Sequence, residues 1–376
     1  MRIAIDYTAA AKQGGGIGRI TRELIAGVAA LDAHNDYHLM VARDAPSFAP
    51  PAANFSLHTI PIPERALNIL WHRARLPLPV EWFGVSADVF HAPNFSLPPS
   101  RAPQRLVTIH DLTFLKYPEG AVPSLRQFLS RSIPDSARRA THLIADSQAT
   151  KDDLCEWLKL PAEKISVVYG GVDARFRPVS DEAQRVAVRA KYQLHQPFVL
   201  GLGTLEPRKN FVGLMQAFTR ARLPDHELVI AGGRGWLYEP IVAAARATPH
   251  VRLLGFVDDS DLPTLYSLAS AYCLPSYYEG FGIPCIEAMA CGAPVICSDR
   301  PCLPEIVGVT STGSGQAAAL IVSPDDADAL ADALQKVVND AKLRQTLIAR
   351  GYARAQEFPW TRGARALWDV YMRVEL

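Results

Sequence analysis

The chain has 376 residues, of which 49% are hydrophobic, so it is long enough to bury the cores of two domains. Its formal net charge is +1 with 20% charged residues, and this near balance gives no electrostatic case for a nucleic-acid partner. No uninterrupted apolar run reaches the length that spans a bilayer, and the N-terminus lacks the apolar core of a signal peptide. We therefore expect a cytoplasmic chain that rests at most on the inner face of a membrane.

The chain contains six cysteines, none of them in a CxxC pair, and five lie in the C-terminal third. Paired spacings are typical of zinc sites, and an even framework of cysteines is typical of small secreted domains. This distribution fits neither class. It predicts reduced thiols in a cytosol, with no disulfide framework and no metal site.

Short apolar runs bounded by turn residues recur along the chain and predict β-strands. They lie at 2–7, 37–42, 55–62, 87–91, 105–110, 142–146, 165–169, 198–203, 227–231, 251–257, 271–275, 294–298 and 319–323. Between many of them apolar residues recur at three- and four-residue steps, as at Ile20, Leu24 and Val28, which predicts helices. Strands that alternate with helices are typical of parallel, doubly wound sheets.

The alternating pattern restarts near Phe198, after a polar stretch that suits a linker and a lead-in helix. We therefore predict two Rossmann-like domains, at 1–175 and 176–355. The remaining segment, 356–376, is rich in helix formers. The sequence leaves open whether this helix packs back on the first domain or completes the second.

A glycine cluster, Gly14–Gly18, follows the first predicted strand and precedes a helix. Glycines let backbone amides approach a phosphate, and the start of a helix adds positive potential. Two familiar phosphate loops do not fit. The loop of nucleotide hydrolases requires a lysine where Arg19 stands, and the dinucleotide fingerprint requires glycine or alanine where Thr21 stands. A glycine cluster alone is weak evidence, because it is more often only a flexible turn. Gly15 and Gly16 are the candidate phosphate contacts in this loop.

His110 and Asp111 stand at the end of the predicted strand 105–110. Ligands of an open parallel sheet sit beyond the carboxyl ends of its strands. His110 could donate to a sugar hydroxyl or a phosphate, and Asp111 could act as a base. Either side chain could instead cap the next segment, and the same choice applies to Asp146.

The segment 276–292 has the strongest pattern, that of a strand end, a tight loop and a helix. Pro284 suits the first helical position, and Gly292 suits the left-handed stop of the helix. Glu279 lies on the loop, and Glu287 lies a little over one turn into the helix. The amides of Phe281–Ile283 stand at the helix start, where a diphosphate or sugar oxygen is favoured. Two carboxylates beside such amides suit a polyhydroxylated ligand that carries phosphates. Either glutamate alone would more often cap or solvate the helix.

Two further clusters also follow predicted strands. GTLEPRKN at Gly203–Asn210 brings Arg208 and Lys209 to a strand end, where they could clamp a diphosphate, although basic loop residues are often only solvated. AGGRGW occupies Ala231–Trp236. All three clusters are expected at one edge of the second sheet, and this convergence strengthens each of them.

Together these segments resemble glycosyltransferase family 4, and the resemblance covers nearly the whole chain. Its specific part is the E-x7-E motif, here Glu279 to Glu287 within EGFGIPCIEAMACGAPVICSD. LPEIVG at Leu303–Gly308 and SQATKDDL at Ser147–Leu154 also look like family segments. The resemblance implies an α/β GT-B fold, in which two Rossmann-like domains face each other across a cleft. It also implies retaining transfer from a nucleoside-diphosphate sugar, with no metal and no other cofactor.

The resemblance further implies how the donor's nucleoside and sugar are bound. Glu287 would hold the ribose hydroxyls, and the Val257 backbone would lie near the base. Glu279 would contact the transferred sugar, helped by the amides of Phe281 and Gly282.

For the diphosphate, the resemblance implies that Lys209 and Arg208 bind it and that the loop Gly15–Gly16 closes over it. His110 would contact the sugar near the reacting carbon. Thr204 departs from the pattern, because several relatives carry arginine there. Lys209 and Arg208 are then the main cations. No side chain in these motifs is an obvious nucleophile, which favours same-face attack by the acceptor hydroxyl.

The segments 110–120 and 203–210 look like those of bacterial mannosyl- and rhamnosyltransferases of surface-polysaccharide assembly. The resemblance implies a GDP-mannose donor, with other GDP-, UDP- or dTDP-sugars next, and a glycan or lipid-linked oligosaccharide acceptor. The segments 69–78 and 125–139 mix basic and apolar residues. They suit contact with an anionic membrane or an ordinary amphipathic surface.

Three other functions have to be weighed. A nucleotide-sugar epimerase would share the fold and the diphosphate site but would act without an acceptor. A nicotinamide-dependent oxidoreductase would require a dinucleotide fingerprint, which Gly14–Gly18 does not supply. A non-catalytic sugar-binding module would bind without turnover.

Overall fold

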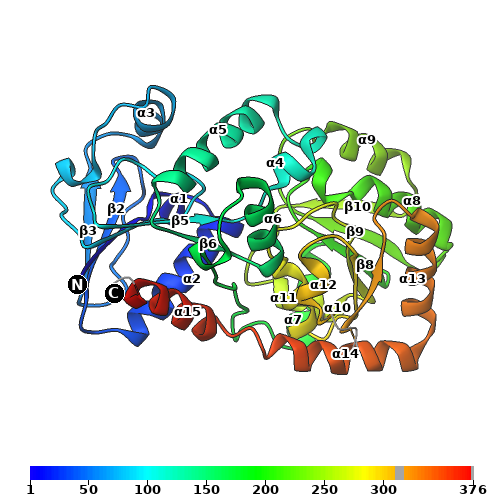
Figure 1. The fold of residues 1–376 in the computed structure, drawn as a ribbon. Coiled ribbons are helices and arrows are strands. Elements are labelled where there is room, and N and C mark those ends of the chain that lie inside the picture. The colour runs from blue at the N-terminus through cyan, green and yellow to red at the C-terminus, as the bar shows by residue number, and fades with distance from the viewer. Residues whose placement is uncertain (310–316, 374–376) are drawn as a thin grey trace. The chain divides into compact units, whose positions relative to one another are not determined.

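The structure is a computed structural model that describes residues 1–309 and 317–373, and Figure 1 shows the order of its elements. The chain divides into two compact units. The first contains 1–112, 124–171 and the segment from Trp360 onward, and the second contains 113–123 and 172–359. Each unit is built around its own parallel sheet.

The first unit contains a seven-stranded sheet in the order β3-β2-β1-β4-β5-β6-β7. Its strands are β1 (Arg2–Asp6), β2 (Asp36–Ala42), β3 (Phe55–Ile60), β4 (Val89–Ala92), β5 (Gln104–Ile109), β6 (His142–Ala145) and β7 (Ile165–Val167). Its helices are α1 (Thr8–Lys12), α2 (Gly16–Leu31), α3 (Glu64–Asn68), α5 (Pro123–Arg139), α6 (Gln148–Leu158) and α15 (Trp360–Met372). Every neighbouring pair of strands is parallel, as the alternating pattern predicts.

The second unit contains a six-stranded parallel sheet in the order β10-β9-β8-β11-β12-β13. Its strands are β8 (Phe198–Leu202), β9 (Glu227–Ala231), β10 (Val251–Gly255), β11 (Ala271–Leu274), β12 (Val295–Ser298) and β13 (Ala319–Val322). Its helices are α4 (Thr113–Lys116), α7 (Glu182–Lys191), α8 (Phe211–Ala221), α9 (Glu239–Ala247), α10 (Leu262–Leu268), α11 (Ile283–Ala290), α12 (Leu303–Ile306), α13 (Ala327–Asn339) and α14 (Ala341–Ala355). All thirteen predicted strands are therefore present in the two sheets, which confirms the predicted fold class.

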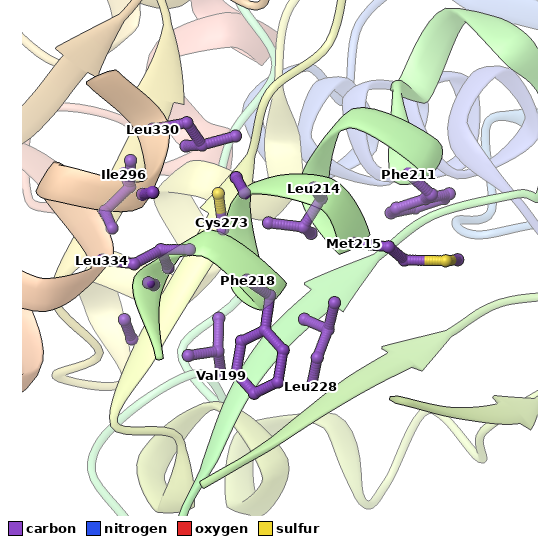
Figure 2. Packing of buried hydrophobic residues seen from close by; sticks show 14 of the residues in the cluster. Val199, Phe211, Leu214, Met215, Phe218, Leu228, Cys273, Ile296, Leu330 and Leu334 are labelled. Atoms are coloured by element: carbon purple, nitrogen blue, oxygen red, sulfur yellow. The ribbon is translucent and has the colours of Figure 1, made fainter. Parts of the chain in front are cut away.

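One face of the second sheet is covered by α8 and α13 (Figure 2). Val199 of β8 and Cys273 of β11 point to this face and pack with Phe218 of α8 and Leu334 of α13. Helix α13 begins where the Asp326 carboxylate accepts hydrogen bonds from two amides of its first turn. The packed face fixes β8 and β11 side by side, and so positions the loops that follow them.

The segment 113–123 differs from the predicted boundary, which placed 1–175 in one continuous domain. It belongs to the second unit. The Tyr117 ring stacks on that of Tyr277, with centroids 4.8 Å apart and planes at 19°. The indole N–H of Trp236 donates to the Gly120 carbonyl at 2.7 Å. These two contacts hold the segment against loops of the second unit.

The C-terminal helix α15 packs on the first unit, which is one of the two placements that the sequence leaves open. A Cβ on Gly27 of α2 would lie 2.5 Å from the Ala364 Cβ, so the two helices approach closely. The indole N–H of Trp368 donates to the Asp32 carboxylate at 2.9 Å. The predicted segment 356–376 extends beyond this helix, and residues 374–376 lie outside the described part of the chain.

None of the six cysteines forms a disulfide, and all but Cys155 are buried. Within the described ranges, no helix is both long and apolar enough to cross a membrane.

Candidate active site

The order of the second sheet reverses between β8 and β11, since β9 and β10 lie to one side of β8 and β12 and β13 lie beyond β11. Ligands of open α/β sheets bind beyond the carboxyl ends of the strands at such a switch point. The loop 203–206 follows β8, and the loop 275–282 follows β11. Two of the sequence clusters therefore stand at the point where the topology favours a ligand.

The centre of this site is a network of charges in which Glu206, Lys209 and Glu279 are buried and Arg208 is partly buried. The Lys209 ammonium lies 2.7 Å from Glu279 Oε1, and the Arg208 guanidinium lies 2.6 Å from Glu279 Oε2. The Ser276 hydroxyl also donates to Glu279 Oε1, at 2.6 Å. Arg208 also forms an ion pair with Glu206, in which the second terminal nitrogen of Arg208 lies 2.5 Å from Glu206 Oε1. Predicted residues 70 positions apart along the chain thus meet, and Glu206 joins them without having been predicted.

Glu279 is ionised in this network. Burial alone would raise the pKa of its carboxyl group, but the Arg208 and Lys209 charges and the bonds from Lys209 and Ser276 outweigh burial and lower that pKa to about 2. A carboxylate with this pKa has no proton to donate at neutral pH. The side chain is therefore suited to binding and to orienting cations, and not to general-acid catalysis.

The AGGRGW cluster packs against the loop that follows β8. The Leu205 amide donates to the Gly233 carbonyl at 2.8 Å. Gly232 has a φ of +147°, and a Cβ there would lie 1.9 Å from the Gly203 carbonyl oxygen, so only glycine fits. Thr204 is exposed on this loop. The structure therefore brings these two clusters together, as predicted from their strand ends.

Helix α11 begins at Ile283, and the preceding Gly282 has a φ of +91°. Gly282 has no side chain that could cap the helix. The first backbone amides of α11 are therefore suited to binding an anion. The Phe281 ring is buried. Glu287 lies within α11 with 2% of its surface exposed, and the Tyr266 hydroxyl donates to its Oε2 at 3.0 Å. Tyr266 was not predicted, because nothing in its local sequence distinguishes it from a core aromatic.

Val257 follows β10 and is buried, whereas the neighbouring Phe256 is 76% exposed. Phe256 therefore offers an aromatic face beside the backbone that the resemblance assigns to the base. Phe256 was not predicted, because the sequence alone does not distinguish an exposed phenylalanine from a buried one.

In the first unit, both ring nitrogens of His110 have partners. Nδ1 lies 2.8 Å from Asp146 Oδ2, and Nε2 lies 2.8 Å from the Pro93 carbonyl oxygen. A carbonyl oxygen only accepts, so Nε2 must carry a hydrogen. His110 as a whole residue is 4% exposed. A sugar contact by the ring, as the resemblance implies, would require one of these bonds to be exchanged.

The surroundings of His110 favour its charged form. Burial alone would lower its pKa, but the Asp146 charge and hydrogen bond and the Pro93 carbonyl raise that pKa above its ordinary value. Nearby His91 behaves oppositely, because burial, and then the His110 charge, lower its pKa to about 3. The neutral ring of His91 forms hydrogen bonds with the hydroxyls of Tyr371 and Thr108, each at 2.8 Å.

We expect Asp146→Asn to destabilise the first unit more at about pH 6 than at about pH 9. The pKa of His110 in the folded chain is raised above its ordinary value of 6.5. The stabilisation that the His110–Asp146 pair gives the first unit is therefore complete below pH 6.5, and it is lost as the pH rises through the pKa of the folded state. Thermal unfolding of both chains at the two pH values measures the difference. A gap between wild type and variant that does not narrow toward high pH would contradict a charged His110.

The glycine loop also lies in the first unit. A Cβ on Gly18 would lie 2.3 Å from the Gln13 carbonyl oxygen, so packing requires glycine there. A Cβ on Gly15 or Gly16 would meet nothing within 4 Å, and both residues are exposed at the start of α2. Packing therefore does not explain Gly15 and Gly16, whereas close approach of a ligand would.

Two family models match the chain. "Glycosyltransferase Family 4" matches residues 14–176, and "Glycosyl transferases group 1" matches residues 186–354. Among solved structures, sucrose-phosphate synthase from Thermosynechococcus elongatus superposes with a TM-score of 0.78, at 24% identity, over 100% of this chain and 99% of that one. The two doubly wound units therefore have the GT-B fold.

Curated relatives carry the identification further. The O-antigen chain mannosyltransferase B of Escherichia coli is 35% identical over 282 residues, which are 72% of this chain and 71% of the relative. The serotype-specific mannosyltransferase WbdA of Escherichia coli is 28% identical over 74% of this chain, which spans 35% of WbdA. The chain belongs to glycosyltransferase family 4 and is a glycosyltransferase.

Proposed function

We propose that the chain transfers mannose from GDP-mannose, with retention and without a metal ion, to a glycan or lipid-linked oligosaccharide in surface-polysaccharide assembly. The observation that carries this proposal is the pairing of Arg208 and Lys209 with the buried Glu279 at the switch point of the second sheet. The 35% identity to an O-antigen mannosyltransferase supports the choice of sugar and of pathway class.

The charges of the site suit a diphosphate leaving group. In the network, the carboxylates of Glu206 and Glu279 balance the cations of Arg208 and Lys209. An incoming diphosphate offers these cations a second set of anionic oxygens. When the bond from the sugar C1 to the diphosphate breaks, negative charge grows on the leaving oxygen. Fixed cations and the start of α11 stabilise that charge as it forms, and so supply what a metal ion would supply elsewhere.

In the proposed transfer, the acceptor hydroxyl attacks C1 from the face that the diphosphate leaves. The acceptor oxygen bonds to C1, the bond between C1 and the diphosphate breaks with its electron pair on the leaving group, and the acceptor proton passes to a phosphate oxygen. No carboxylate is needed as a nucleophile. Glu279 is paired with Arg208 and Lys209 and accepts a hydrogen bond from Ser276, so its carboxylate is suited to binding and not to nucleophilic attack. A retaining glycosidase would use a pair of carboxylates as acid and nucleophile.

The remaining donor contacts in the proposal follow the family. Glu287 holds the ribose, and Val257 and the exposed Phe256 lie toward the base. Gly15 and Gly16 approach the phosphates, and the His110 region approaches the sugar. The room around both glycines supports a ligand contact there.

A lipid-linked acceptor would bring the chain to a membrane surface, and the first unit carries residues suited to that contact. Ile69, Leu76 and Trp82 are 43%, 39% and 60% exposed. The Arg101 guanidinium lies 5.8 Å from the Trp82 ring centroid, and Arg73 is exposed nearby in sequence. Exposed tryptophan beside basic residues is typical of peripheral contact with anionic lipid. We include such contact at the inner face of the cell membrane in the proposal.

The proposal predicts acceptor-dependent release of GDP from GDP-mannose, faster than release from UDP- or dTDP-sugars. EDTA should leave the rate unchanged, because protein cations stabilise the leaving group. A lipid-linked acceptor should be used faster in anionic than in neutral vesicles. Nucleoside diphosphate release, with the anomeric configuration of the product read by NMR, measures these outcomes.

Other outcomes separate the competing functions. Donor consumption without acceptor would indicate an epimerase, and binding without turnover would indicate a sugar-binding module. Loss of activity in EDTA that magnesium restores would contradict metal independence. A covalent glycosyl-enzyme trapped in mass spectrometry would contradict same-face attack by the acceptor.

A further inference from the structure

The hydroxyl of Tyr266 is buried against one of the two motif glutamates. Tyr266 belongs to α10 and is fully buried, and its hydroxyl lies 3.0 Å from Oε2 of Glu287 in α11. Burying a phenol hydroxyl costs free energy unless it finds a partner. Here the partner is a carboxylate at the carboxyl-end edge of the sheet, 21 residues further along the chain.

The direction of this hydrogen bond is fixed. Burial, and then the Glu287 charge, raise the pKa of Tyr266 well above its ordinary value. The phenol therefore keeps its proton at physiological pH, and it donates to a carboxylate that can only accept. A hydrogen bond to a charged acceptor is stronger and more directional than a neutral one.

The ring that carries this hydroxyl is itself held in place. Tyr266 meets Phe176 with centroids 6.2 Å apart and planes at 60°, and it meets Tyr272 with centroids 5.4 Å apart and planes at 78°. Edge-to-face packing on two sides restricts the rotation of the ring. The hydroxyl therefore reaches Glu287 from a fixed direction and restricts the plane of its carboxylate.

We propose that Tyr266 is a positioning residue that orients the Glu287 carboxylate toward the donor ribose. This inference rests on the proposed function, in which Glu287 accepts hydrogen bonds from the ribose hydroxyls. Tyr266 fixes the direction of Oε2 and so fixes the orientation in which the carboxylate meets the ribose. Side chains that support a ligand-binding group in this way reduce the entropy lost when the ligand binds.

Tyr272 provides a matched control. It is as fully buried as Tyr266, and its hydroxyl donates to the Leu202 backbone carbonyl at 3.4 Å instead of to a carboxylate. Tyr266→Phe and Tyr272→Phe each remove one buried hydroxyl and keep the ring. Any general loss of stability is therefore shared by the two variants.

The experiment measures Kd for GDP and for 2′,3′-dideoxy-GDP by calorimetry, with UDP and its dideoxy analogue alongside. We expect Tyr266→Phe to weaken GDP binding about threefold to tenfold, and tenfold corresponds to about 1.4 kcal/mol. The dideoxy analogue should bind Tyr266→Phe and wild type equally, because it has no ribose hydroxyl for Glu287 to hold. The KM for the donor should rise with kcat unchanged, since the ribose contact is the same in the ground and transition states.

Two results would overturn the inference. One is equal GDP binding by Tyr266→Phe and wild type. The other is an equal loss for GDP and its dideoxy analogue, which would mean that the hydroxyl acts only through stability. Failure of the wild-type chain to bind either nucleoside diphosphate would instead contradict the proposed function, and the inference with it. Tyr272→Phe should keep wild-type affinity for both ligands.

Discussion

Replacing Lys209 by alanine is expected to lower kcat about 100- to 1000-fold, because loss of one preorganised group that stabilises developing charge costs about this much. Lys209 is 7% exposed, and its ammonium is held 2.7 Å from Glu279. Steady-state release of nucleoside diphosphate with saturating donor measures the loss.

The control for this variant is Lys191→Ala. Lys191 also forms ion pairs in the second unit, with Asp258 and Asp261 at 2.6 Å each, but its side chain is 47% exposed. Exposed ion pairs of this kind contribute little to the stability of the fold, so the kcat of Lys191→Ala should equal that of wild type. Full activity in Lys209→Ala would contradict the diphosphate clamp. An equal loss in both variants would point to stability instead.

Replacing Glu287 by alanine is expected to raise the Kd of the nucleoside diphosphate about 10- to 100-fold, since hydrogen bonds to a charged acceptor contribute about 1.5–3 kcal/mol each. The effect should appear for the product nucleotide as well as for the donor, because both carry the ribose. Calorimetric titration measures it. Binding that is unchanged would remove Glu287 from the nucleotide site.

Glu227→Ala is the matched control for a buried glutamate. Glu227 begins β9, at the edge of the sheet opposite the switch-point loops, and is paired with Arg252 at 3.3 Å. Its removal should lower the unfolding midpoint of the second unit, as loss of a buried partner does, and leave nucleotide affinity unchanged. A comparison of the two variants separates a binding effect from a folding effect.

The sequence predicts the sheets well, because buried parallel strands are short apolar runs between turn residues, as at 227–231 and 271–275. It also predicts that the loops after β8 and β11 share an edge, because parallel strands place their carboxyl ends together. Helix α11 ends before Gly292, whose φ of +80° suits the predicted stop.

The pairing of charges was not predictable. The sequence indicates Lys209 and Arg208 as phosphate-binding residues, but in the folded chain both form ion pairs with Glu279. Which carboxylate meets which cation depends on side chains from two loops separated by 70 positions, and no local pattern encodes that choice. His110 shows the same limit, because its partners Pro93 and Asp146 come from two other strand ends.

The boundary at 113–123 was missed for a related reason. The segment follows β5 of the first unit along the chain, but its contacts are made by Tyr117 and Gly120 with Tyr277 and Trp236 of the second. Aromatic residues in a loop indicate burial without indicating the partner. Only the folded chain identifies the surface that receives them.

The central claim is that Lys209 and Arg208, beside Glu279, hold the pyrophosphate of a sugar nucleotide as it leaves. A crystal structure of the chain with bound GDP tests it most directly. We expect the diphosphate at the carboxyl ends of β8 and β11, with phosphate oxygens on these cations and the ribose at Glu287. A nucleotide bound in another part of the chain, with the Lys209–Glu279 pair undisturbed, would contradict the account.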